Sequence, residues 1–154
     1  MEGATILIQT ALDLLAWTLL VKDRTVLSEN GFEKLSAMDK LRRLGLACEV
    51  PLDIPASMVE ISKLAKKHNW TDAPQALVEI RNALVHPNPK NRLRQAGLIA
   101  ETRVLRECWR LGLWFLELVI LKLVSYEGSY SNRLQQDVSG HHKAESVPWT
   151  RGTA

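Results

Sequence analysis

Two stretches of the chain are so apolar that they limit the fold class more than any other feature. Residues 6–21 and 111–124 consist mainly of large apolar side chains. A helix that is apolar almost all round must be covered by neighbours on several sides. Gln9 and Asp13 interrupt the first stretch, and the second is shorter than the ~20 residues that span a bilayer. Both therefore predict buried helices, with apolar surface left for a subunit interface, and no membrane association.

The remaining sequence is typical of further helices separated by clear breaks. Asp72 and Pro74 are start signals for one of them, because Asp can cap a helix and Pro suits its first turn. Residues 28–31 are expected to form a loop, no stretch alternates like a strand, and the polar tail has no apolar period. The sequence therefore predicts an all-α, up-and-down bundle of about five helices over residues 1–127 and an irregular C-terminal tail over 128–154. The expected helices cover 5–21, 32–46, 55–68, 73–85 and 96–126.

Composition agrees with one domain plus a tail. The chain has 154 residues, of which 46% are hydrophobic and 24% charged, as in ordinary globular proteins. Cys48 and Cys108 are isolated, so they are expected to be core residues in a reducing, cytoplasmic setting. His141 and His142 lack a third ligand at a zinc-like spacing. We therefore expect no metal site and no cofactor.

The positive charge is concentrated in one window. The net charge is only +3, but residues 81–110 hold seven Lys or Arg against Glu101 and Glu107. A local basic patch indicates a phosphate-bearing partner, although a solvated helix face gives the same pattern. Lys90, Arg92 and Arg94 are the candidates for binding RNA phosphates.

One short motif carries chemistry near the end of the fourth expected helix. Arg81, Asn82 and His86 are predicted to lie together at this helix end. Arg matches two phosphate oxygens, His exchanges a proton near neutral pH, and Asn can orient the imidazole or the ribose. With RNA as substrate, the 2′-hydroxyl is a built-in nucleophile, so cleavage needs no metal. The products would be a 2′,3′-cyclic phosphate and a 5′-hydroxyl.

The motif supplies one histidine per chain, whereas the reaction needs both a base and an acid. A twofold dimer with facing helix ends would supply two. Asp13, inside the first apolar stretch, is expected to pair with an arginine near this site.

Arg81 and Asn82 followed by His86, late in a helix of an all-α bundle, resemble the Arg-x4-6-His motif of the HEPN superfamily. The tail, with Tyr126 to Arg133 and the closing Val147-Pro148-Trp149, is similar to the HEPN domains of ApeA-type bacterial anti-phage proteins. The resemblance covers about residues 1–133. One difference is Asn88, at a position where some HEPN toxins carry a tyrosine that a partner enzyme modifies.

The resemblance implies a metal-independent endoribonuclease of a toxin or anti-phage defence system. It implies a homodimer whose shared cleft contains Arg81, Asn82 and His86 of both subunits. Its substrate would be RNA, such as tRNA or mRNA, and an antitoxin or sensor domain would be a further partner. Two alternatives stay open. One is a non-catalytic HEPN module for dimerisation or nucleotide binding that docks a partner, and the other is a helical adaptor without a nucleic-acid role.

Overall fold

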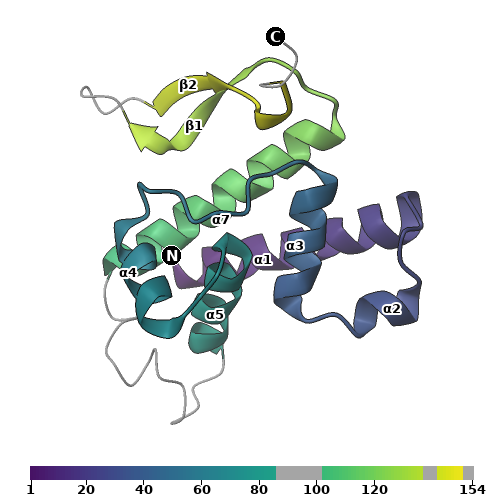
Figure 1. The fold of residues 1–154 in the computed structure, drawn as a ribbon, viewed down its shortest axis with the longest axis horizontal. Helices are drawn as coiled ribbons and strands as arrows, with labels where there is room; N and C mark the ends of the chain where they lie inside the picture. Colours follow the sequence, from purple (N-terminus) through teal and green to yellow (C-terminus); the bar gives the residue numbers. More distant parts are fainter. Residues whose placement is uncertain (86–101, 137–141, 151–154) are drawn as a thin grey trace.

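The computed structural model of the chain describes residues 1–85, 102–136 and 142–150, which form mostly helices and one small sheet (Figure 1). Helix α1 continues directly into a π-helical segment, η1, and a two-stranded antiparallel sheet follows the last long helix. This confirms the predicted helical character, and it adds the sheet. The elements are α1 Glu2–Trp17, η1 Thr18–Asp23, α2 Glu29–Glu33, α3 Ala37–Ala47, α4 Val59–His68, α5 Ala73–Val85, α7 Thr102–Leu123, β1 Ser129–Gln136, β2 His142–Ser146 and the 3-10 turn η3 Pro148–Thr150.

The two apolar stretches form α1 and α7, which pack against each other in the core. Leu12, Leu111 and Phe115 are fully buried there. Gly112 permits the close approach of the two helices, since a Cβ atom at this position would lie 3.1 Å from Cγ2 of Ile8. Helices α3 and α5 pack against both long helices, and α7 lies between α5 and the sheet in Figure 1. Each stretch therefore buries one face in the core, whereas Leu7, Leu14 and Val124 are exposed.

One continuous helix, Glu2–Asp23, is long and apolar enough to cross a membrane by length and composition, in the part of the chain that was described. Leu12, Ala16 and Leu19 of this helix are buried in the core. The core of a folded domain therefore accounts for much of its apolar character.

The boundary between the first and second helices differs from the prediction. Residues 28–31, expected as a loop, include the start of the short helix α2, where the Ser28 hydroxyl accepts a hydrogen bond of 3.0 Å from the backbone N–H of Gly31. Phe32 belongs to α2 rather than to the next helix. That helix, α3, begins only after Ser36, whose hydroxyl accepts from the backbone N–H of Asp39. The apolar pattern predicted one helix over 32–46, and the two serine caps divide this part of the chain between α2 and α3.

The tail predicted to be irregular instead contains the hairpin of β1 and β2, so that prediction was wrong. Tyr130, Asn132 and Leu134 are buried, while the residues between them are less covered. The alternation of buried and less covered residues along β1 was not recognisable in the sequence, because the middle buried residue, Asn132, is polar. Asn132 is satisfied internally: its amide donates to Glu145 Oε1 at 2.7 Å, and its Oδ1 accepts from the Leu134 backbone N–H at 2.9 Å. Tyr130 and Leu134 join the same core as the helices.

Candidate functional site

Helix α5, which carries Arg81 and Asn82, is anchored at its first turn. The Oδ1 atom of Asp72 accepts a hydrogen bond of 2.8 Å from the backbone N–H of Gln75. The Gln75 side chain accepts in turn from the backbone N–H and the hydroxyl of Thr71, at 3.0 and 3.1 Å. These bonds satisfy donors that a helix start otherwise leaves unpaired. The prediction that Asp72 starts this helix is confirmed.

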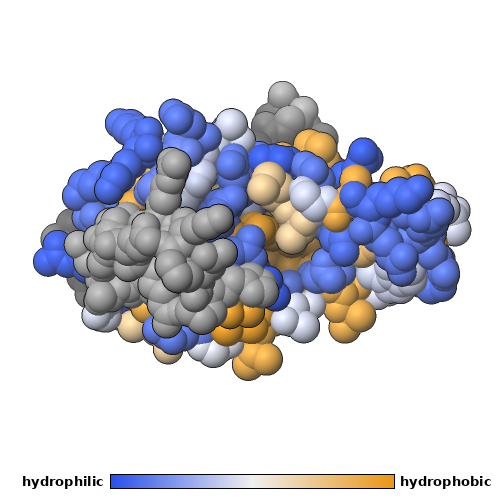
Figure 2. All heavy atoms as spheres, turned by 90° about the horizontal axis from the view of Figure 1, so that it is seen from below, coloured by the Kyte–Doolittle hydropathy of each residue, from blue (hydrophilic) through white to orange (hydrophobic). Residues whose placement is uncertain are grey.

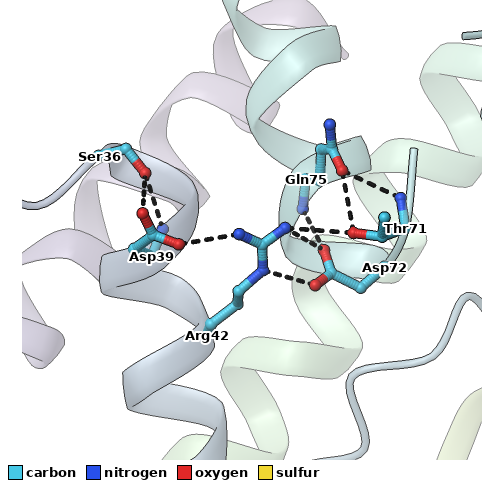
Figure 3. A network of polar contacts seen from close by, with 6 residues as sticks. All are labelled: Ser36, Asp39, Arg42, Thr71, Asp72 and Gln75. Carbon is cyan, nitrogen blue, oxygen red and sulfur yellow. Dashed lines mark hydrogen bonds and ion pairs between the residues drawn. The ribbon is translucent and has the colours of Figure 1, made fainter. Parts of the chain in front are cut away.

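Arg42 ties this helix start to α3, as Figure 3 shows. Its Nε donates to Asp72 Oδ2 at 2.5 Å, and its Nη1 donates to Asp39 Oδ1 at 2.8 Å. The hydrogen bond with Asp72 raises the pKa of Arg42 above its ordinary value. Hydrogen bonds from Ser36 and then Arg42 lower the pKa of Asp39. The network fixes the orientation of α5 relative to α3.

Replacing Asp72 by alanine should lower the free energy of unfolding by about 2 kcal/mol, because it removes a helix cap and leaves Arg42 without its main partner. Asp72→Asn is the matched control. This variant keeps a side-chain acceptor for the backbone N–H of Gln75, so its free energy of unfolding should fall by about half as much. Urea denaturation followed by circular dichroism measures both. Equal losses in the two variants would contradict a capping role.

Arg81 and Asn82 lie half-buried near the C-terminal end of α5. Leu77 and Ile80 face the core, as predicted, which leaves the polar pair at its edge. Arg81 Nη1 donates a hydrogen bond of 3.2 Å to Asn82 Oδ1. No ion pair joins Arg81 to a carboxylate of the described residues. Its remaining guanidinium donors are thus not committed to a carboxylate there, and Asn82 orients the arginine.

Arg81 lines a cavity of about 380 Å³ between α1, α3 and α5. The face of the molecule in Figure 2 is hollowed near its middle, where apolar surface is surrounded by hydrophilic side chains. Helix α5 contributes Arg81, and the other two helices contribute the remaining polar groups of the cavity. The polar residues of its wall are Gln9, Thr10, Asp13, Lys40 and Arg81.

Asp13 pairs with a lysine rather than with the expected arginine. Its Oδ1 lies 3.6 Å from Nζ of Lys40, which α3 positions across from α1. Asp13 and Arg81 both line this cavity. Sequence reasoning missed Lys40, because a lysine beside core-facing residues of a helix gives no signal of its own.

The other predicted site residues cannot be placed. His86, Lys90, Arg92 and Arg94 lie outside the described residues, and α5 is described up to Val85, the residue before His86. Within the basic window, Arg110 has a structural partner, since its Nε donates to the backbone carbonyl of Arg133 at 3.1 Å. One positive charge of that window therefore joins α7 to the hairpin.

The cysteines lack the environment of a nucleophile. Both are buried free thiols. Burial raises the pKa of Cys108 to about 12 and also raises the pKa of Cys48, so both stay protonated at neutral pH. Across residues 1–85, 102–136 and 142–150, no group of three or more His, Cys, Asp or Glu side chains is arranged to hold a metal ion.

A second hollow, missed in the sequence, lies between the hairpin and the segment before α4. Its volume is about 430 Å³, and its wall includes Trp114, Tyr130 and Glu145. The Trp114 indole N–H donates to the Tyr130 hydroxyl at 3.0 Å, and this hydroxyl donates to Glu145 Oε1 at 2.7 Å. These bonds attach the hairpin to α7.

Comparison with known proteins places the chain in a family. Residues 1–145 match the model of the YopA C-terminal domain. The SPbeta prophage-derived uncharacterized protein YopA of Bacillus subtilis (strain 168) is 34% identical over 150 residues. The alignment covers 96% of this chain and 31% of that protein, so the chain spans about a third of the relative's length. No solved structure matches the chain. By its match over most of its length, the chain belongs to the YopA C-terminal domain family.

Proposed function

We propose that this chain is a metal-independent endoribonuclease domain of a toxin or anti-phage defence system. The observation that carries the proposal is the position of Arg81: it lines a cavity together with polar side chains of α1 and α3, and it forms no ion pair with a carboxylate of the described residues. His86 follows five positions later in the sequence. The relative from B. subtilis is a prophage-derived protein. The proposed fold is of the HEPN type.

In the proposed reaction, the ribose 2′-hydroxyl attacks its adjacent phosphate and the 5′-oxygen leaves. Arg81 binds the non-bridging phosphate oxygens and stabilises the negative charge that they carry in the phosphorane. His86 of one subunit takes the 2′-hydroxyl proton, and His86 of the other gives a proton to the leaving oxygen. Asn82 holds the arginine through its Oδ1, which leaves its amide N–H groups for the substrate. Lys90, Arg92 and Arg94 bind flanking phosphates, and no cofactor takes part.

The direct test is cleavage of end-labelled tRNA and mRNA in excess EDTA. The proposal expects products that end in a 2′,3′-cyclic phosphate, and it expects Arg81→Ala to lose them. Arg43→Ala, which removes an exposed arginine of α3, is the matched control and should cut normally. Cleavage that stops on addition of EDTA would contradict a metal-independent reaction.

The homodimer has a candidate surface on α1. Leu7 and Leu14 are 70% and 64% exposed, and their spacing of seven residues places them on one helix face. Thr10 and Asp13 of the same helix line the Arg81 cavity. A second copy packed on this face would cover the two leucines and bring the two cavities close together.

Leu7→Asp combined with Leu14→Asp should convert the dimer to a monomer and abolish RNA cleavage, because burying two carboxylates in an apolar interface is strongly unfavourable. Sedimentation equilibrium measures the mass of the parent and of the variant. Val59→Asp, at an exposed apolar position of α4, is the control and should remain dimeric. A variant with the parental mass and parental activity would exclude this interface.

One observation favours the alternative of a non-catalytic module that docks a partner. The chain spans about a third of the relative's length, so its counterpart there adjoins a much larger remainder. This alternative predicts a tight dimer and no RNA product at any protein concentration. For a helical adaptor without a nucleic-acid role, the parent chain and the Arg81→Ala variant should instead have the same RNA affinity.

A further inference from the structure

The ammonium group of Lys40 is held in place by an aromatic ring and a long ion pair. Its side chain is 18% exposed, and Nζ lies 4.4 Å from the centre of the Phe32 ring. The nearest carboxylate oxygen, Oδ1 of Asp13, is 3.6 Å away, which is too long for a good hydrogen bond. No described residue accepts a hydrogen bond from Nζ. Neither the ring nor the long ion pair takes up the three N–H donors of the ammonium, so they are available to a ligand.

The charges around the cavity favour an anionic ligand. Lys40 from α3 and Arg81 from α5 supply two positive charges, and Asp13 supplies one negative charge. The Asp13 side chain is 54% exposed, so water stabilises it without Lys40. Lys40 is thus free to exchange its loose ion pair for a direct hydrogen bond with an oxyanion. Both cations extend from helices whose relative orientation the Arg42 network fixes.

We infer that Lys40 is a second phosphate-binding residue of the Arg81 cavity, and that Asp13 is the counterion it exchanges for an RNA phosphodiester. This inference rests on the proposed function, because it takes RNA as the ligand. Arg81 binds the phosphate that is cleaved, and Lys40 binds a neighbouring phosphate. Gln9 and Thr10 also line the cavity. The Gln9 amide donates to the Leu77 carbonyl and the Thr10 hydroxyl donates to the Ile6 carbonyl at 3.0 Å, so their oxygens would meet a ribose hydroxyl as acceptors.

The test measures binding separately from cleavage. A fluorescein-labelled single-stranded RNA is titrated against the full chain carrying His86→Ala, with further substitutions on that background. Lys40→Gln should weaken binding about tenfold, since it removes a charge-assisted hydrogen bond. It should also reduce the slope of log affinity against log salt by about 0.7, the value for one phosphate contact on a single strand. Lys67→Gln removes an exposed lysine of α4 and should change binding by less than twofold.

Asp13→Asn should change the RNA affinity in the opposite direction to Lys40→Gln. This difference separates a role in ligand binding from a structural role. Asp13→Asn removes the competing carboxylate, so binding should become about threefold tighter. If the Asp13–Lys40 pair only supported the fold, both substitutions would weaken binding together. Lys40→Arg keeps the charge and should bind RNA nearly as well as the background. This variant guards against a folding defect in Lys40→Gln.

The results distinguish the role of Lys40 from the proposed ribonuclease activity. Equal binding by the Lys40→Gln and Lys67→Gln variants overturns the role of Lys40, even if the parent chain cleaves RNA. Loss of binding in Lys40→Gln together with a parent chain that never cleaves RNA supports the phosphate site and contradicts the ribonuclease. Absence of RNA binding by every variant overturns both.

Discussion

Replacing His86 by alanine should reduce RNA cleavage in excess EDTA by about 100-fold to 10,000-fold, the contribution typical of a positioned general acid or base. In the proposed dimer the loss falls at the upper end, because one substitution removes the base and the acid together. RNA binding should change little, since the proposed phosphate contacts come from Arg81, Lys40 and the basic residues after His86 rather than from His86 itself. The measurement is the initial rate of cyclic-phosphate formation, compared with the parent chain at equal protein concentration.

His68→Ala is the matched control for this substitution. His68 lies at the end of α4, where its ring stacks on Trp70 with 5.6 Å between ring centres, away from the α5 motif. This variant should keep the parental rate of cleavage. The melting temperature of each variant separates a lost catalytic group from a lost fold. A His86→Ala chain that cuts RNA as fast as the parent would exclude His86 as the catalytic acid and base, and with it the proposed mechanism.

The sequence predicts those parts of the fold that depend on local signals. Helix α5 begins where Asp72 and Pro74 indicate, because a cap and a first-turn proline act within one turn of the chain. Helix α2 was missed because five residues starting at a serine cap have no measurable apolar period. The hairpin was missed because Asn132 occupies an inward position, and the groups that satisfy it lie elsewhere in the hairpin.

The candidate site is predictable only in part, for a similar reason. Arg81 and Asn82 are recognisable because their chemistry lies in one short motif. Lys40 is 27 positions from Asp13, and only the packing of α3 against α1 brings them together. The sequence indicated that Asp13 needed a cation, but it could not choose among the basic residues. Lys40 is recognisable as a candidate only from its tertiary neighbours, so it could be identified only in the structure.

Replacing Phe115 by alanine should lower the free energy of unfolding by about 3–5 kcal/mol, the cost typical of deleting a fully buried aromatic side chain. Phe115 is the side chain on which α3 approaches α7. A Cβ atom placed on Gly45 would lie 2.9 Å from Cζ of Phe115 and 2.5 Å from Cδ2 of Leu52. The glycine is therefore required by the space that Leu52 and the Phe115 ring occupy together.

A double-mutant cycle tests this geometry more sharply than either single change. Gly45→Ala should destabilise the parent chain despite its gain of ~1 kcal/mol in helix propensity. In the Phe115→Leu background the same change should cost about 1 kcal/mol less, because leucine lacks the Cζ atom that the new methyl group would meet. Gly3→Ala, where a Cβ meets nothing within 4 Å, is the control and should be neutral or stabilising. If Gly45→Ala costs the same in both backgrounds, the ring does not set the distance between α3 and α7. The position of Lys40 relative to Arg81 would then have to be fixed by the Arg42 network alone.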